Sequence, residues 1–147
     1  MIAPTPTPLE RRVAAAQALL DDWKGRAFDW KARSHCARMV ADHLRRMGHT
    51  PPLAKAGPFS SELGALRALR RLGADTLAAA MDNAGFVRIP PLAALAGDVL
   101  ELPTESRLGC LTVALGNGRV LGFIDGAEGA AVLQPVDYAA AWRVEPR

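Results

Sequence analysis

The chain has 147 residues, half of them apolar, 22% charged, and a net charge of +3. This length suffices for one substantial hydrophobic core and matches the most common domain size, so we expect a single domain over residues 1–147. No apolar run approaches the roughly 20 residues that span a bilayer, and the first residues lack a secretory signal, so we expect a soluble protein without a membrane span. The two widely spaced cysteines match neither a disulfide framework nor a zinc site, and we expect no metal or other cofactor.

The charge is unevenly distributed along the chain. Residues 1–96 carry 14 Lys and Arg against 8 Asp and Glu, a net charge of +6, whereas residues 97–147 carry 4 against 7, a net charge of −3. Such asymmetry concerns association with charged partners and not the fold. With eight aromatic residues and no long basic run, the sequence does not favour nucleic acid as a partner.

The first predicted helix covers residues 9–24. Thr7 can cap it, Pro8 suits the first helical position, and Glu10 completes a capping box. Apolar residues at helical spacing predict the buried face: Leu9, Val13, Ala16, Leu20 and Trp23. Arg11 and Arg12 are expected largely off this face.

A second helix is predicted over residues 34–47, with Ser34 as its cap and Gly48 after its end. It carries Cys36 at its start, on the same apolar stripe as Met39 and Val40. Free cysteines on such stripes usually behave as small hydrophobic residues.

A third helix is predicted over residues 61–72, and a shorter fourth within residues 75–85. The third carries three arginines that we interpret as a solvated face, with a nucleic-acid-binding surface as the alternative; they are Arg67, Arg70 and Arg71. Residues 88–95 contain two prolines and are predicted to form a connector.

After Gly97 the pattern changes to short apolar runs broken by glycine. Residues 110–125 predict a hairpin of two antiparallel strands around Asn117 and Gly118, which tolerate a positive φ. Further strands are predicted within residues 97–103, 130–138 and 140–144. A helical part, 1–96, followed by a strand part, 97–147, indicates an α+β domain whose helices pack on a small antiparallel sheet.

Few residues suggest chemistry. No phosphate-binding loop, dinucleotide-binding turn, zinc-protease motif or hydrolase elbow is present. Carboxylates at Asp21, Asp22, Asp98 and Glu101 have no companion residues that single them out, and we expect them at the surface or in turns.

Cys36 is therefore the main candidate. Its place near a helix N-terminus favours the thiolate, but a cysteine nucleophile also needs a base. His35 projects about 100° away around the helix, His43 lies roughly 10 Å along the axis, and His49 is farther still. None is expected to reach the thiol.

The order of the motifs nevertheless resembles a known group. "HCARMVAD", "AGDVLEL" and "LTVALGNGRVLGF" resemble the NlpC-like cysteine peptidase superfamily, which has a papain-like fold. With "FDW", "LGALRALRRLG" and "AAAWRV", the chain is similar over nearly its whole length to uncharacterised phage and prophage proteins related to that superfamily and encoded among tail genes. The resemblance implies that a nucleophile helix packs against a small antiparallel sheet.

The resemblance also implies catalytic positions, residue by residue. Cys36 matches the nucleophile. The superfamily's histidine falls on Cys110, six residues before Gly116, and its third, polar member falls on Gly122. The site would then lack two of three members, and the Cys36 and Cys110 side chains would face each other between helix and sheet.

These expectations favour a non-catalytic protein. The resemblance implies a structural component, or an assembly factor, of the tail tip or baseplate of a long-tailed phage. Its partners would be other tail proteins, a homo-oligomer would suit the symmetry of the tail, and the protein would reside in the virion after assembly in the host cytoplasm. The alternative is an active cysteine hydrolase that cuts peptidoglycan peptides during genome entry, with a base from another subunit or from His49.

Overall fold

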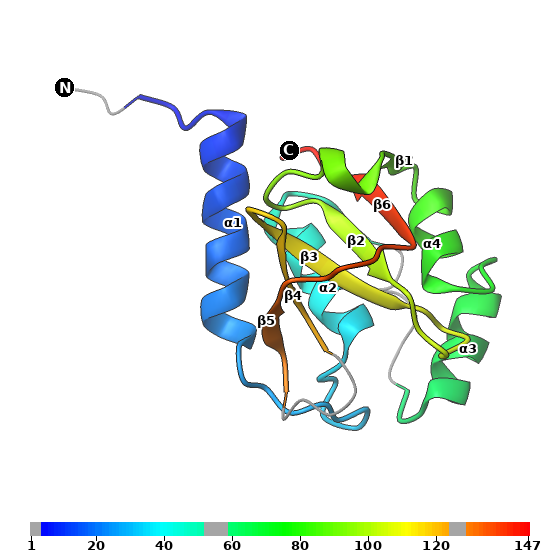
Figure 1. Ribbon diagram of the computed structural model, residues 1–147. Coiled ribbons are helices and arrows are strands. Elements are labelled where there is room, and N and C mark those ends of the chain that lie inside the picture. Colours follow the sequence, from blue (N-terminus) through cyan, green and yellow to red (C-terminus); the bar gives the residue numbers. More distant parts are fainter. Residues whose placement is uncertain (1–3, 52–58, 124–128) are drawn as a thin grey trace.

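A computed structural model describes residues 4–51, 59–123 and 129–147. Within these residues four α-helices pack against a six-stranded antiparallel sheet (Figure 1). The helices are α1 (Pro8–Trp23), α2 (Cys36–Arg46), α3 (Glu62–Arg71) and α4 (Leu77–Asn83). The strands are β1 (Val87–Arg88), β2 (Val99–Leu102), β3 (Cys110–Gly116), β4 (Arg119–Gly122), β5 (Ala131–Leu133) and β6 (Ala140–Arg143). The predicted α+β class is confirmed.

The sheet order is β1-β6-β2-β3-β4-β5, and every neighbouring pair is antiparallel. The predicted hairpin forms β3 and β4, with Asn117 at φ 55° and Gly118 at φ 74° in the turn. Residues 124 and 125, at the end of that prediction, lie outside the described residues. β1 was not predicted: it pairs with β6 and includes Arg88, where we expected a connector.

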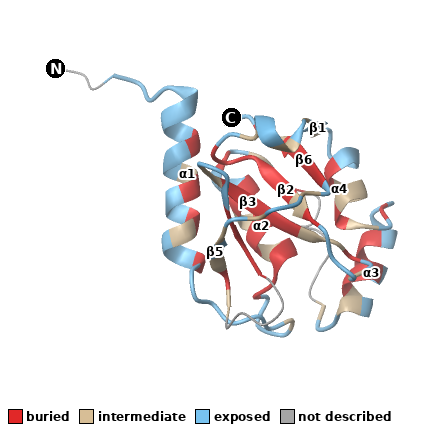
Figure 2. Cartoon of the chain, in the orientation of Figure 1, coloured by how far each residue is buried: buried red, intermediate tan, exposed pale blue. Residues whose placement is uncertain are grey.

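The two faces of the sheet bury different clusters. The first cluster joins all four helices to alternate strand residues such as Leu111, Val113 and Leu121. In Figure 2 the buried stretches, in red, lie on the strands and on parts of the helices. The second cluster lies on the opposite face and is built by the intervening strand residues, among them Leu100, Ala114 and Val120. The chain between β5 and β6 crosses this opposite face, on which none of the four described α-helices lies (Figure 1).

α1 packs differently from the prediction. Thr7 caps the helix as expected, since its Oγ1 accepts the N–H of Glu10 at 3.1 Å. Glu10 does reach back, but its carboxylate accepts the Thr7 hydroxyl and not the backbone N–H that the predicted capping box uses. However, Leu9 and Val13, predicted to be buried, are 58% and 51% exposed. The buried residues of α1 are Arg12, Ala16, Leu19 and Trp23. The helix is therefore rotated relative to the expected stripe, and a buried guanidinium takes part in its contact.

Asp98 explains this rotation. Its side chain is fully buried and not at the surface, contrary to expectation. Oδ1 accepts hydrogen bonds from Arg12 at 2.9 Å and from the N–H of Val144 at 2.8 Å. Oδ2 accepts from the N–H of Leu95 at 2.9 Å and forms an ion pair with Arg143 at 3.0 Å. This one carboxylate thus ties α1 to the chain before β2 and to the end of β6.

Candidate functional site

The start of α2 lies at one end of the first cluster. The helix begins at Cys36, and its N-cap is His35, whose Nδ1 accepts the N–H of Arg38 at 3.2 Å. Ser34, the predicted cap, is used elsewhere: its hydroxyl donates to the carbonyl of Ala27, and its backbone pairs with Asp29. Cys36 therefore occupies the first helical position.

The Cys36 thiol is enclosed. The residue is 7% exposed and belongs to the first cluster, as its place on the apolar stripe predicted. Burial raises the pKa of the Cys36 thiol, and nearby backbone N–H groups of Leu111 and Ala37 only partly oppose this shift. Burial thus outweighs the helix terminus, and the structure favours the neutral thiol over the nucleophilic thiolate.

His35 does not act as a base toward its neighbour. Its ring lies between two aromatic rings, with centroids 4.7 Å from Trp30 and 5.1 Å from Phe59. Burial, assisted by the charge of Arg38, lowers the pKa of His35 to about 4. With Nδ1 engaged by the helix cap, this imidazole has a structural role in starting α2.

The other two histidines are also engaged elsewhere. His43 is fully buried, and its Nε2 lies 2.8 Å from the carbonyl oxygen of Gly97. Nε2 of His49, after the end of α2, lies 2.6 Å from the carbonyl oxygen of Glu145. As predicted, no hydrogen bond joins any of the three histidines to the Cys36 thiol within the described residues.

Cys110 and Gly122 lie on the other face of the sheet. Cys110 pairs with Leu102, belongs with it to the second cluster, and donates its thiol proton to the carbonyl of Phe123 at 3.5 Å. A Cβ on Gly122 would stand 2.5 Å from Cγ2 of Thr112. Because strand residues alternate between faces, neither position points toward Cys36.

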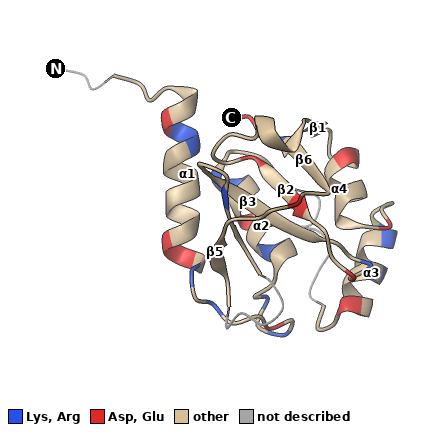
Figure 3. Cartoon of the chain, in the orientation of Figure 1, with Lys and Arg blue, Asp and Glu red and all other residues tan. Residues whose placement is uncertain are grey.

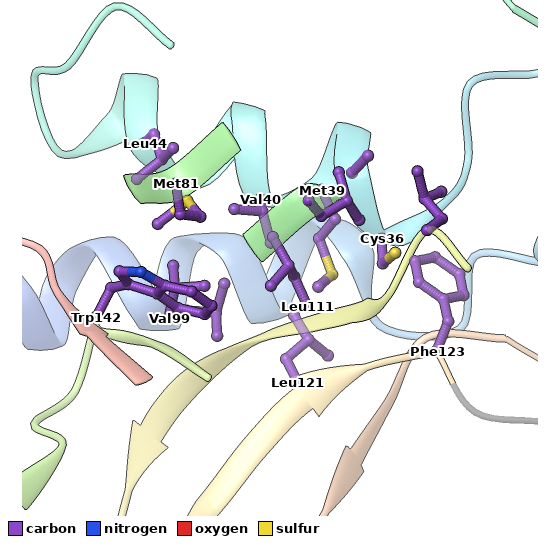
Figure 4. Close-up of a cluster of buried hydrophobic side chains, with 14 of the residues drawn as sticks. Cys36, Met39, Val40, Leu44, Met81, Val99, Leu111, Leu121, Phe123 and Trp142 are labelled. Atoms are coloured by element: carbon purple, nitrogen blue, oxygen red, sulfur yellow. The ribbon is translucent and has the colours of Figure 1, made fainter. Parts of the chain in front are cut away.

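The two cysteines therefore belong to different clusters, on opposite faces of the sheet, and no disulfide joins them. The residues one position further along the chain, Leu111 on β3 and Phe123 directly after β4, belong instead to the first cluster with Cys36 (Figure 4). Val113 on β3 pairs with Leu121 on β4. Continued by two residues, the same register places Leu111 opposite Phe123. Two apolar side chains thus lie on the helix-facing side of the sheet at this place.

One carboxylate influences the thiol. Glu101 lies on β2, and its charge contributes to the raised pKa of Cys36. Burial also raises the pKa of Glu101. We expected this residue at the surface or in a turn, but it is half-buried on a strand. An anion near the sulfur opposes thiolate formation, so Glu101 does not activate Cys36 as a nucleophile.

Other kinds of site are not visible in residues 4–51, 59–123 and 129–147. No three His, Cys, Asp or Glu side chains there are grouped so that they could hold a metal ion. No described helix combines the length and hydropathy needed to cross a membrane. Arg67, Arg70 and Arg71 are exposed on α3, as predicted.

Comparison with known proteins identifies the chain by family. No match is found among curated proteins. A family model described as a domain of unknown function, DUF6950, matches residues 8–144, which include every helix and strand described above. The chain therefore belongs to the DUF6950 family.

Proposed function

We propose that this protein is a non-catalytic, papain-like NlpC-type domain that serves as a structural component or assembly factor of a long-tailed phage's tail tip or baseplate. The observation that carries the proposal is the environment of Cys36. The residue stands at the start of a helix that packs on the central strand β3, the arrangement expected of a nucleophile helix. Yet its thiol is buried in the first cluster with Leu111 and Phe123, and no histidine of the described residues is hydrogen-bonded to it.

The loss of activity follows from the chemistry of cysteine hydrolases. These enzymes need a thiolate, a histidine to accept and return a proton, and space for the substrate next to the sulfur. Cys36 has a raised pKa and is 7% exposed. Substrate would have to displace part of the core before it reached the sulfur.

The assignment to a phage tail rests on the order of the sequence motifs, which extends over nearly the whole chain. Other tail proteins are the proposed partners, and the proposed location is the virion, after assembly in the host cytoplasm. An active hydrolase of peptidoglycan peptides is the alternative, favoured only by the place of Cys36 at a helix N-terminus.

Thiol labelling separates these two functions. In the Cys110→Ala variant, Cys36 is the remaining thiol. In the folded protein it should react with an electrophilic probe at pH 7 far more slowly than it does after unfolding in denaturant. Cys36→Ala added to the same variant is the matched control for labelling at other residues. Fast labelling below pH 7 that Cys36→Ala abolishes, or release of peptides from peptidoglycan that the same change abolishes, would contradict the non-catalytic proposal.

The tail assignment needs its own test. Deletion of the gene in the phage that encodes it should abolish or shorten tails, as seen by electron microscopy, and the Cys36→Ala gene should restore them. Mass spectrometry of purified virions then separates a structural component, present at fixed stoichiometry, from an assembly factor, which is absent. Normal tails without the gene would refute both roles.

A further inference from the structure

One side of α1 carries apolar side chains that the rest of the chain leaves exposed to solvent. Leu9 is 58% and Val13 51% exposed, and Leu20 is half-buried. At 3.6 residues per turn these three side chains fall within about 40° of one another around the helix. They therefore form one stripe, beside the buried stripe and distinct from it. We call this stripe, Leu9, Val13 and Leu20, the α1 flank.

Charges stand at both ends of the α1 flank, and none lies on it. Glu10 is in the first turn and Lys24 directly follows the last helical residue; both are exposed. Lys24 forms no ion pair with any described residue. Figure 3 shows that the charged positions of α1 gather near its two ends and leave its middle uncharged. Asp21 lies about 20° from Glu10 around the helix and accepts a hydrogen bond from Gln17, whereas Arg11 and Asp22 lie on the side away from the flank. The charges nearest the flank are therefore Glu10 at one end and Lys24 at the other.

We propose that the α1 flank is the interface of a homodimer, in which the α1 helices of two copies pack antiparallel. A two-fold axis near Gln17 places Val13 of each copy against Leu20 of the other. The same offset places Glu10 of each copy beside Lys24 of the other, so that the dimer contains this ion pair twice. A parallel pair would instead place Glu10 against Glu10 and Lys24 against Lys24.

A second copy fits this surface for reasons of symmetry. An isologous interface must be complementary to itself, which requires opposite charges at equal distances from its centre. Leu9 and Lys24 are separated by about 22 Å along the helix axis, so the contact is one helix long. Such an interface lies at the lower end of specific interfaces in size, and we expect dissociation in the micromolar range. The proposal does not depend on the phage-tail function.

Sedimentation equilibrium of the full chain between about 1 and 200 µM tests the proposal. The wild-type protein should be a dimer at the upper end of this range. Val13→Glu should be a monomer throughout. Ala18→Glu is the matched control, because Ala18 is also exposed on α1 but faces about 140° away from Val13. Circular dichroism should show both variants folded.

Charge exchange tests the antiparallel arrangement. Lys24→Glu chains carry two acidic ends and Glu10→Lys chains carry two basic ends, so each variant alone should bind itself at least tenfold more weakly. An equimolar mixture should restore the dimer, since each chain then meets the opposite charges, and so should the chain with both changes. A monomeric wild type, a dimer that Val13→Glu leaves intact, or a mixture that stays monomeric would overturn the proposal.

Discussion

Removal of the Asp98 carboxylate should be among the most destabilising single changes in this protein. The residue is fully buried, and its two oxygens have four partners: Arg12, Arg143 and the N–H groups of Leu95 and Val144. Asp98→Ala would leave the guanidinium of Arg12, which is 3% exposed, without its closest buried counter-charge. Its remaining carboxylate partner, Glu145, is largely exposed to solvent.

The magnitude follows from this burial. Breaking a buried ion pair by removing one partner costs about 3–5 kcal/mol, because the other charge stays buried and unpaired. That is a large part of the roughly 5–15 kcal/mol that stabilises a typical domain. For a chain of this size it corresponds to a fall in Tm of about 6–20 °C. Asp21 is an exposed carboxylate on α1, and its removal should change the free energy of unfolding by no more than about 0.5 kcal/mol.

Urea denaturation followed by circular dichroism measures this loss, with Asp21→Ala as the control. In a double-mutant cycle, Arg12→Met together with Asp98→Ala should be less destabilised than the sum of the single changes by at least about 1 kcal/mol. The double variant no longer buries the unpaired guanidinium. A loss below about 1 kcal/mol for Asp98→Ala, or strictly additive effects, would refute the assignment of Asp98 as the buried anchor of α1.

Three further predictions concern other buried residues. Burial lowers the pKa of His43 to about 4, below its unfolded value near 6.5, so the unfolded state binds the proton first. The contribution of His43 to the free energy of unfolding should therefore fall by about 2 kcal/mol as the pH drops from 7 to 4.5. His35, whose pKa is also lowered to about 4, adds a fall of its own, so the total fall should be reduced but not abolished in His43→Leu. Gly122→Ala should lower the free energy of unfolding, measured by chemical denaturation, by about 1–3 kcal/mol. Thr112→Ser in the same chain should recover part of this loss, because it removes the methyl group that the new Cβ meets. No recovery would contradict the packing described. Cys36→Ser should lower Tm, because it places a hydroxyl among apolar side chains, and an unchanged Tm would show that the site is hydrated.

Local sequence signals were sufficient for most of the secondary structure. The predicted cap Thr7 accepts the backbone N–H of Glu10, and the Asn117 turn joins two strands of the expected hairpin, although His35 replaces the predicted cap Ser34. These features depend on neighbours within a few residues. β1 depends instead on pairing with β6, more than fifty residues away, and Val87 and Arg88 carry no local pattern that distinguishes a strand from a connector.

The rotation of α1 shows what periodicity alone does not contain. Leu9 and Val13 share a helical spacing with Ala16 and Trp23, so all four were predicted to be buried, and only Ala16 and Trp23 are. Arg12 is buried instead because Asp98, 86 residues away in sequence, meets it at 2.9 Å. A buried arginine is stable only when such a partner exists, and the sequence gives no sign of which carboxylate that will be.

A shift of one residue in strand register decides which side chains of β3 and β4 lie on the same side of the sheet as Cys36. Counting from Gly116 placed Cys110 and Gly122 at the two remaining positions of a catalytic site, and alternation along β3 and β4 puts both on the face away from α2. A shift of one residue exchanges the whole set of facing side chains. Leu111 and Phe123, which lie on the α2 side, have apolar side chains that accept no proton, and Gly122 has no side chain at all. Within the described residues, neither correspondence places a histidine beside Cys36, and the burial of its thiol is an independent observation in favour of the non-catalytic function proposed above.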